Sequence, residues 1–218
     1  MLEYTSIVRR IESDAPGSIL DWGCGFGQVS DLLLRAGLDV TSFDYYGDEA
    51  LDTVQALPRF PAVRAHLSSD PRSLPYDDGA FDTVLSCGVL EHVLDPDASL
   101  DEIARVLKPG GTLYVYKLPN RFSYLEWVAR RAGMYYHGCA PDDLLYTPAT
   151  ARELVERHGY EVLELRLANM LPLTLDAPVL QRPRAARMVW SANRAIARVP
   201  GVKALATNVE LIAQRPPA

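Results

Sequence analysis

The chain has 218 residues, of which 48% are apolar and 23% are charged. These proportions supply one sizeable hydrophobic core, so we expect a single domain over residues 1–218 without extended disorder. The formal net charge at pH 7 is −6. An acidic chain lacks the basic field that general binding to nucleic acid or to an anionic membrane surface needs, so neither partner is expected.

The cysteines and the N-terminal segment indicate the compartment. The chain holds three cysteines, Cys24, Cys87 and Cys139, which are far apart and lack metal-binding spacing. This pattern is typical of a reducing cytosol rather than of a disulfide framework. Residues 1–10 contain no apolar run of signal-peptide length, and no stretch reaches transmembrane length. We therefore expect a cytoplasmic protein without a membrane span.

Helices and strands are expected to alternate along the chain. The apolar side chains of residues 28–36 recur at the spacing of one helix face, and Gly37 follows as a stop. The expected helices are 2–13, 28–36, 98–107, one that Thr147 and Pro148 begin and Gly159 ends, and 184–199. The expected strands are 18–22, 40–43, a weaker 63–66, 81–86, 112–116, 162–167 and 209–214.

This alternation predicts a doubly wound α/β fold, in which helices cover both faces of a mostly parallel sheet. Ligands of such sheets bind beyond the carboxyl ends of the strands. The aromatic-rich segment 120–147 follows the fifth strand, so we assign it to an acceptor lid beside a cofactor-binding core at about 15–120. The C-terminal strands and a helical insertion occupy about 160–218. The insertion fits either a lid or the contact of a homodimer.

A glycine-rich loop joins the first strand to the helix after it. Residues 21–27 read DWGCGFG, with glycines at 23, 25 and 27. Glycines permit positive φ and close approach of the backbone to a ligand. The N–H groups at the start of the following helix suit a carboxylate or a phosphate. The alternative interpretation is an ordinary tight turn between strand and helix.

Acidic residues stand at the ends of the neighbouring strands. Asp21 directly precedes the loop, where its carboxylate can take the ammonium group of an amino-acid ligand. Asp44 ends the second strand, where it can accept both hydroxyls of a ribose. Asp70 follows the third strand and can take an exocyclic adenine amine. Together with the loop, these positions predict a nucleoside-bearing ligand.

The loop spacing is G-x-G-x-G rather than the G-x-G-x-x-G of dinucleotide binders. With the acids above, LPY at 74–76, LEH at 90–92 and LKPGG at 107–111, the chain resembles the class I S-adenosylmethionine-dependent methyltransferases, type 11/12. It is most similar to the small-molecule enzymes of that family, which include those of ubiquinone biosynthesis, over about residues 18–120. The resemblance implies a Rossmann-like seven-stranded sheet whose last strand is antiparallel. It also implies S-adenosylmethionine as cofactor and S-adenosylhomocysteine as product.

The resemblance implies roles for the loop and for the end of the fourth strand. Gly23, Cys24, Gly25 and Gly27 would line the methionine part of the cofactor. Cys87 would lie beside the cofactor through its backbone. The alternative for Cys87 is a buried small apolar residue.

The resemblance also implies how the nucleoside is held. Asp44 would bind the ribose, and Asp70 and Pro71 would flank the adenine. Tyr45, which follows Asp44, would cover the face of the adenine ring. The alternative for Tyr45 is an ordinary surface aromatic.

The sequence departs from the ubiquinone-type relatives at one position. These relatives carry a carboxylate three residues before the Glu of the Glu-His pair, and it helps to bind a divalent metal. Here that position is Gly88. We therefore expect no metal site of this type.

Methyl transfer from a sulfonium is an in-line displacement, in which positioning supplies much of the rate. A hydroxyl acceptor also needs a general base, and histidine titrates in the neutral range. The candidates are His92, which Glu91 can orient, and His137 in the lid. The alternatives are a helix-start residue bonded to backbone for His92, helix N-terminal electrostatics for Glu91, and a solvated loop histidine for His137.

The acceptor pocket is expected among aromatic side chains. Tyr124, Tyr135 and Tyr136 lie in the lid segment and offer flat faces to a ring or a sugar, and Tyr4 of the leading helix can reach the same cleft. The alternative is an amphipathic lid helix with core packing.

The C-terminal insertion contains a run of arginines. It fits a solvated helix face or, less simply, a site for an anionic acceptor or partner. The run consists of Arg182, Arg184, Arg187, Arg194 and Arg198.

These features favour an enzyme that methylates a small-molecule acceptor. Residues 120–127 (NRFSYLEW) weakly resemble bacterial O-methyltransferases of sugars and polysaccharides, so a hydroxyl of a sugar or polysaccharide precursor is the first expectation. O- or N-methylation of a phenolic or natural-product acceptor is the alternative. Two alternatives are more distant. A NAD-dependent oxidoreductase is opposed by the loop spacing. A non-catalytic S-adenosylmethionine-binding partner protein is opposed by the intact set of loop glycines and Asp44.

Overall fold

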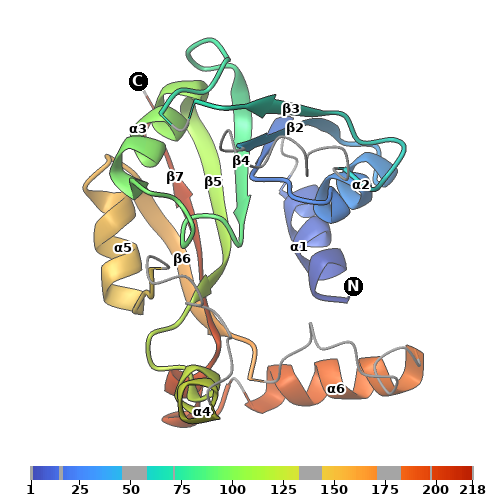
Figure 1. Cartoon of the computed structure of the whole chain (residues 1–218), viewed down its shortest axis with the longest axis vertical. Helices are drawn as coiled ribbons and strands as arrows, with labels where there is room; N and C mark the ends of the chain where they lie inside the picture. Colours follow the sequence, from blue (N-terminus) through green and yellow to red (C-terminus); the bar gives the residue numbers. More distant parts are fainter. Residues whose placement is uncertain are drawn as a thin grey trace.

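The computed structural model describes residues 2–14, 17–45, 58–70, 72–132, 144–170, 183–196 and 198–217. Its centre is a seven-stranded sheet with the order β3-β2-β1-β4-β5-β7-β6 (Figure 1). The strands are β1 Ser18–Trp22, β2 Asp39–Tyr45, β3 Ala65–Ser68, β4 Phe81–Cys87, β5 Leu107–Pro119, β6 Glu161–Ala168 and β7 Asn208–Gln214. β7 runs antiparallel to both β5 and β6, whereas the other pairs are parallel. The predicted doubly wound sheet with an antiparallel last strand is confirmed.

Helices cover both faces of the sheet. They are α1 Leu2–Ser13, α2 Gln28–Arg35, α3 Pro96–Val106, α4 Tyr124–Ala132, α5 Pro148–Glu156, α6 Pro183–Ile196 and the 3-10 helix η3 Val202–Leu205. α1 and α2 lie on one face, and α3 and α5 lie on the other (Figure 1). None of the helices in these ranges is both long and apolar enough to cross a membrane.

The two faces are separate hydrophobic cores, and strand alternation divides residues between them. Ile19 and Leu85 pack against α1 and α2, while their neighbours Leu20 and Val84 pack against α3 and α5. Successive side chains of a strand point to opposite faces, so a buried strand must be apolar along its length. This requirement explains the continuous apolar runs by which the central strands were predicted.

Several boundaries differ from the predicted ones. α3 begins earlier, because Asp95 caps it by accepting from the Ala98 N–H at 3.0 Å and Pro96 occupies its first turn. It also ends directly at β5, so Gly110 lies within that strand, where its N–H donates to the Arg215 carbonyl. The predicted strand 63–66 is shifted to β3, and α6 is shorter than the predicted helix 184–199.

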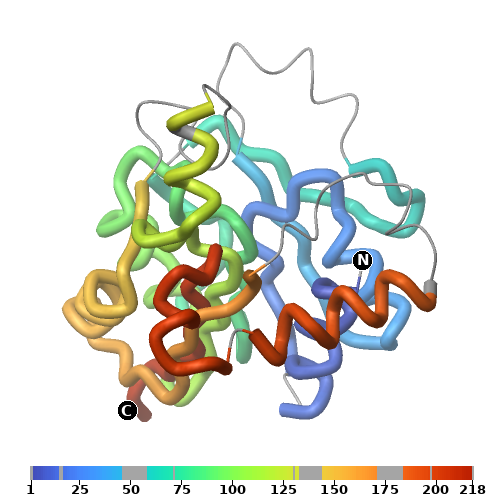
Figure 2. Tube along the Cα trace, turned by 90° about the horizontal axis from the view of Figure 1, so that it is seen from below, coloured from blue at the N-terminus to red at the C-terminus, as the bar shows by residue number. Residues whose placement is uncertain are grey.

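The carboxyl ends of the parallel strands all point to one edge of the sheet. In Figure 1 this is the lower edge, where α4 and α6 lie beyond the ends of β4 and β5. α6 contacts α1, although most of the chain separates them (Figure 2). The segments that did not fit the strand–helix alternation are therefore gathered at the edge where ligands of such sheets bind.

Candidate active site

The glycine loop after β1 has the strained backbone that its sequence predicts. Gly23, Gly25 and Gly27 have φ of 76°, 52° and 81°. A Cβ added to Gly23 would collide with the Val89 side chain, whereas a Cβ on Gly25 would meet nothing within 4 Å. Gly23 is thus required by packing. Gly25 faces open space, which leaves its backbone accessible to a ligand.

Asp44 ties the end of β2 to this loop. Its Oδ2 accepts from the Gly25 N–H at 2.5 Å, and its Oδ1 accepts from the Tyr45 N–H at 2.8 Å. Burial raises the pKa of the Asp44 carboxyl, although the hydrogen bonds from Gly25 and Tyr45 act in the opposite direction. The residues predicted to hold the methionine and ribose parts of a cofactor are therefore brought into direct contact.

These residues open onto a cleft of about 600 Å³ at the carboxyl ends of β1, β2 and β4. A cavity of this size is typical of a small-molecule site. The predicted site residues that line it are Gly23, Gly25, Asp44, Tyr45, Asp70 and His92. Trp22 and Gly88 line it as well, so the cleft spans the ends of β1 and β4.

Asp21 lies beneath the loop rather than on the wall of the cleft. Its side chain is buried and accepts a hydrogen bond from Ser30 Oγ, which itself accepts from Ser42 Oγ at 2.8 Å. Burial raises the pKa of Asp21 to about 6; the Ser30 hydrogen bond opposes this rise, and the nearby Asp44 adds to it. In this arrangement Asp21 anchors the first turn of α2 to β1 and β2.

Cys24, Gly27 and Cys87 are not among the residues that line the cleft. Burial raises the pKa of both thiols, so Cys24 and Cys87 stay protonated at neutral pH and are not nucleophiles. A Cβ on Gly27 would crowd Pro58 and Val63. Gly27 therefore allows the loop to pack against the segment before β3.

Glu91 and His92 follow the end of β4 as an adjacent pair. Glu91 is 1% exposed, and its Oε1 lies 3.8 Å from Nε2 of His92, whose side chain is 54% exposed. The backbone carbonyl of Glu91 accepts from the Leu144 N–H at 2.9 Å. The structure thus places an exposed imidazole at the cleft with a buried carboxylate beside it, which is the arrangement by which a carboxylate orients a histidine base.

The residues predicted to bind the acceptor do not gather at the cleft as the cofactor residues do. Tyr4 and Tyr124 are not among the residues that line the cleft. The Tyr4 hydroxyl accepts from Nζ of Lys117 at 3.2 Å, and the Tyr124 hydroxyl donates to the Met170 carbonyl. The remaining predicted site residues lie outside the described ranges: Pro71, Tyr135, Tyr136 and His137.

Sequence reasoning missed residues that only tertiary contacts bring to the cleft. Glu102 of α3 lines it, accepts from the Leu74 N–H at 2.8 Å and pairs with Arg105 at 2.8 Å. In the sequence this pair has the spacing of two exposed helix residues, which gives no signal of a site. Local sequence patterns also give no signal of Lys117, which does not line the cleft but has a φ of 66° at an irregularity of β5.

Two observations bear on the groups that the cleft can hold. The open space at Gly25 and the carboxylate of Asp44 fit a ligand with a ribose, because carboxylate oxygens accept from vicinal hydroxyls. Within the ranges that the structure describes, no group of three or more histidine, cysteine or carboxylate side chains is placed to hold a metal ion. The donor set thus fits a nucleoside cofactor.

Comparison with protein families and curated sequences agrees with this geometry. Residues 20–115 match the family model described as the methyltransferase domain. A relative from Xanthomonas euvesicatoria pv. vesicatoria (strain 85-10), named ubiquinone biosynthesis O-methyltransferase, is 37% identical over 142 residues, which cover 59% of this chain and 56% of the relative. The match thus spans little more than half the length of the curated relatives.

Solved structures share the fold. A SAM-dependent methyltransferase from Methanosarcina mazei superposes with a TM-score of 0.62 at 20% identity, covering 92% of this chain and 93% of that one. The cyclase SpnF superposes with a TM-score of 0.59 at 22% identity, covering 99% of this chain and 82% of that one. At these identities the likeness establishes the fold alone, and a cyclase among the neighbours illustrates that one fold supports different reactions.

Proposed function

We propose that the protein is a class I S-adenosylmethionine-dependent methyltransferase that methylates a hydroxyl oxygen of a small-molecule acceptor; the match of residues 20–115 to the methyltransferase domain supports this proposal. The observation that carries this proposal is the bond between Gly25 and Asp44 at the wall of a cleft of about 600 Å³. It supports a site that binds the ribose and the amino-acid part of one ligand on adjacent strands. A dinucleotide site is opposed by the G-x-G-x-G spacing.

S-adenosylmethionine, when bound, supplies an electrophilic methyl group on its sulfonium. The backbone of Gly25 would face the cofactor, Asp44 would accept from the ribose hydroxyls, and Tyr45 and Asp70 would flank the adenine. The loop backbone and the Asp44 carboxylate are held in place, because Gly23 packs against Val89 and Asp44 accepts from the Gly25 N–H. Such preorganisation lowers the entropic barrier to the reaction.

His92 is the proposed base that takes the proton of the acceptor hydroxyl. Its imidazole lines the cleft, and the Glu91 carboxylate lies 3.8 Å from Nε2. A buried carboxylate stabilises the imidazolium that forms when the proton is accepted. Glu91 is thus a positioning residue, and His92 is the residue that would contact the acceptor.

The chemical class of the acceptor is open to the alternatives raised by the sequence. The name of the Xanthomonas relative refers to ubiquinone biosynthesis, which favours a hydroxyl on a ring of the phenol or quinone kind. The sugar hydroxyl suggested by residues 120–127 has no counterpart in that name. We therefore give a phenolic hydroxyl precedence over a sugar hydroxyl.

A calorimetric titration with S-adenosylhomocysteine tests the cofactor site. We expect stoichiometric binding to the wild-type chain and at least tenfold weaker binding to Asp44→Ala, because tenfold corresponds to about 1.4 kcal/mol, the size of one charge-assisted hydrogen bond. The matched control is Asp39→Ala, an exposed aspartate at the other end of β2. Absence of binding to the wild type, or protection from unfolding by NAD instead, would contradict the proposal.

A further inference from the structure

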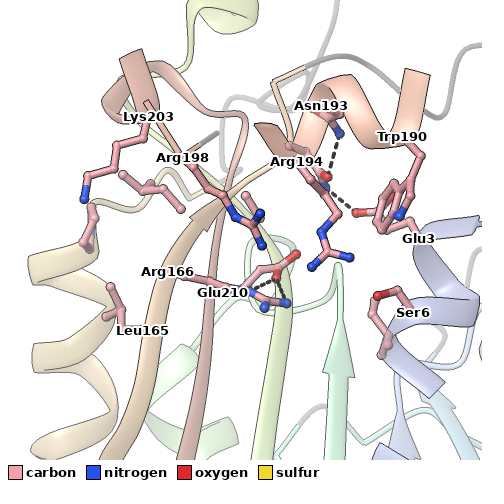
Figure 3. A pocket seen from close by; sticks show the side chains of 15 residues that line it. Glu3, Ser6, Leu165, Arg166, Trp190, Asn193, Arg194, Arg198, Lys203 and Glu210 are labelled. Atoms are coloured by element: carbon pink, nitrogen blue, oxygen red, sulfur yellow. Dashed lines mark hydrogen bonds and ion pairs between the residues drawn. The ribbon is translucent and has the colours of Figure 1, made fainter. Parts of the chain in front are cut away.

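A second cavity, of about 670 Å³, lies between α1, α6 and the antiparallel pair of β6 and β7 (Figure 3). It lies at the same edge of the sheet as the cofactor cleft but on the side of α1, and the two cavities share no lining residue. Four basic side chains line it, Arg166, Arg194, Arg198 and Lys203, against the acidic Glu3 and Glu210. This balance is opposite to that of the chain, whose net charge is −6.

The acidic side chains of the cavity are already engaged. Glu210 accepts from both Nε and Nη2 of Arg166 at 2.8 Å, so this pair is neutral overall. Glu3 accepts a hydrogen bond from the side chain of Asn169. In the described part of the chain, neither carboxylate forms an ion pair with Arg194 or Arg198.

The arginines of α6 and of the turn after it are therefore the available charges. Figure 3 shows that Arg194 and Arg198 extend from above toward the Arg166–Glu210 pair, whereas Lys203 points away toward α5. Within the described residues, no ion pair or side-chain hydrogen bond joins Arg194 or Arg198 to another group. Guanidinium groups that converge without a partner are the usual recognition element for a carboxylate or a phosphate.

The frame of the cavity is fixed by buried polar contacts. Asn193 of α6 is 1% exposed, its Nδ2 donates to Oδ1 of Asn169 at 3.1 Å, and its Oδ1 accepts from the Met170 N–H. Asn169 in turn donates to Glu3 of α1. This chain of hydrogen bonds joins α6, the end of β6 and α1, so it fixes the helix that carries Arg194.

The cavity also has an apolar wall. Trp190 of α6 is half-buried and lines it together with Ile7, Leu165 and Leu167. A tryptophan face beside guanidinium groups suits a ligand that has a planar or apolar body and an anionic end.

The cavity is adjacent to the end of β5 through α1. Glu3, which lines it, precedes Tyr4, and the Tyr4 hydroxyl accepts from Lys117 near the end of β5. Burial alone lowers the pKa of Lys117, but Glu3, Tyr4 and Cys87 raise it overall, so the ammonium is charged. The Tyr4–Lys117 hydrogen bond thus joins α1, which lines this cavity, to β5.

We infer that this cavity binds an organic anion whose carboxylate or phosphate is held by Arg194 and Arg198 and whose planar or apolar body packs against Trp190. Charge and shape both select for such a ligand. A neutral ligand would leave the two guanidinium groups without a counter-charge, whereas an oxyanion would form charge-assisted hydrogen bonds with them. This inference assigns two arginines of the insertion to an anionic ligand instead of a solvated face.

Fluorescence and calorimetric titrations with 4-hydroxybenzoate, phenyl phosphate and phenol test this inference on the full chain. We expect one or both anions to bind and phenol to bind at least tenfold more weakly. The double variant Arg194→Ala/Arg198→Ala should bind the anion at least tenfold more weakly than the wild type does. The control Arg184→Ala, on the same helix but not lining the cavity, should leave binding unchanged. Preference for one anion identifies the carboxylate or the phosphate as the group recognised.

Tryptophan variants locate the bound probe. Trp190→Phe should abolish the change in fluorescence on anion binding, whereas Trp127→Phe, an exposed residue of α4, should retain it. S-adenosylhomocysteine binding should be equal in the wild type and in the double arginine variant, which also reports that the variant is folded. Equal anion binding by the wild type and the double variant, or preference for phenol, would overturn the inference.

The same titrations distinguish this inference from the proposed function. If the anion binds through the arginines but S-adenosylhomocysteine does not bind the wild type, the proposed function fails and the anion site stands. If S-adenosylhomocysteine binds and neither anion does, the proposed function stands and the anion site is refuted.

Discussion

Gly25 and Asp44 are joined by a hydrogen bond of 2.5 Å between the loop after β1 and the end of β2, across 19 positions of sequence. The glycine presents its N–H to the carboxylate because its φ of 52° turns the backbone in a way that other residues rarely adopt. The same turn directs the missing side chain into the open cleft. One residue thereby positions the proposed ribose acceptor and leaves space for the cofactor.

Gly25→Ala should abolish binding of S-adenosylhomocysteine with only a small loss of stability. The strained backbone costs about 1–2 kcal/mol, and the added methyl group occupies the cleft. Gly37→Ala is the control, because Gly37 has a φ of 78° and open space around it but lies at the end of α2. We expect similar falls in Tm for both variants, by a few degrees. Equal loss of ligand binding in both would contradict the assignment.

Gly23→Ala should instead unfold the loop. The added methyl group collides with Val89, so the cost of overpacking adds to the cost of a φ of 76°. We expect a loss of about 2–4 kcal/mol in the free energy of unfolding, measured by urea denaturation. Gly23→Ala with Val89→Ala should recover part of it. No recovery would show that the backbone strain alone is responsible.

Asp21 should make stability depend on pH between about 4 and 6. Its folded pKa of about 6 lies above its ordinary value of 3.8, so folding favours the protonated form. The stabilisation is complete below pH 4 and is lost as pH rises through 6, by up to about 3 kcal/mol. Asp21→Asn removes this dependence. The free energy of unfolding of the variant should therefore increase relative to that of the wild type between pH 4 and pH 7.

The control for this measurement is Asp39→Asn, which replaces an exposed aspartate at the start of β2. Its free energy of unfolding should follow that of the wild type over the whole range. If Asp21→Asn also follows the wild type, burial does not raise the pKa of the Asp21 carboxyl group.

Asp82 should have the opposite dependence. The Lys108 ammonium, at 2.8 Å, and the Ser18 N–H lower the pKa of Asp82 to about 2. A lowered pKa gives stability that is present above about 4 and is lost as pH falls toward 2. Because the Asp82 side chain is 41% exposed, solvent screening limits the effect of Asp82→Asn to about 1 kcal/mol at pH 7. Urea denaturation should show this difference between the wild type and Asp82→Asn at pH 7 and its loss at pH 2.5.

His92→Ala should reduce methyl transfer by about 100- to 10,000-fold, the usual contribution of a general base. Binding of S-adenosylhomocysteine should be nearly unchanged. Glu91→Gln should reduce transfer less, because Glu91 acts through His92. Rates are measured with a labelled methyl donor under saturating cofactor.

His158→Gln is the control for a histidine far from the cleft. Its ring nitrogens contact Asp97 at 2.7 Å and Asp101 at 2.6 Å, so the residue joins α5 to α3. The variant should lose stability and retain its rate. A fall in rate equal to that of His92→Ala would mean that neither histidine acts as the base.

Sequence alone predicted the order of the elements and the residues around the first two strands. The reason is local: strands repeat every two residues and helices every 3.6, and a loop of glycines between Asp21 and Asp44 is informative without any distant contact. Boundaries failed where a cap or a strand partner decided them, as at Asp95 and at Gly110.

Only the tertiary structure decided how these residues are used. Asp21, which was predicted to bind a ligand, is buried and accepts a hydrogen bond from Ser30 of α2, a contact that the sequence does not reveal. The second cavity depends on contacts across more than a hundred residues, such as that between Glu3 and Asn169, which no periodicity encodes. Whether an arginine can bind a ligand depends on what the fold places beside it, and Arg194 and Arg198 line a cavity together with Trp190.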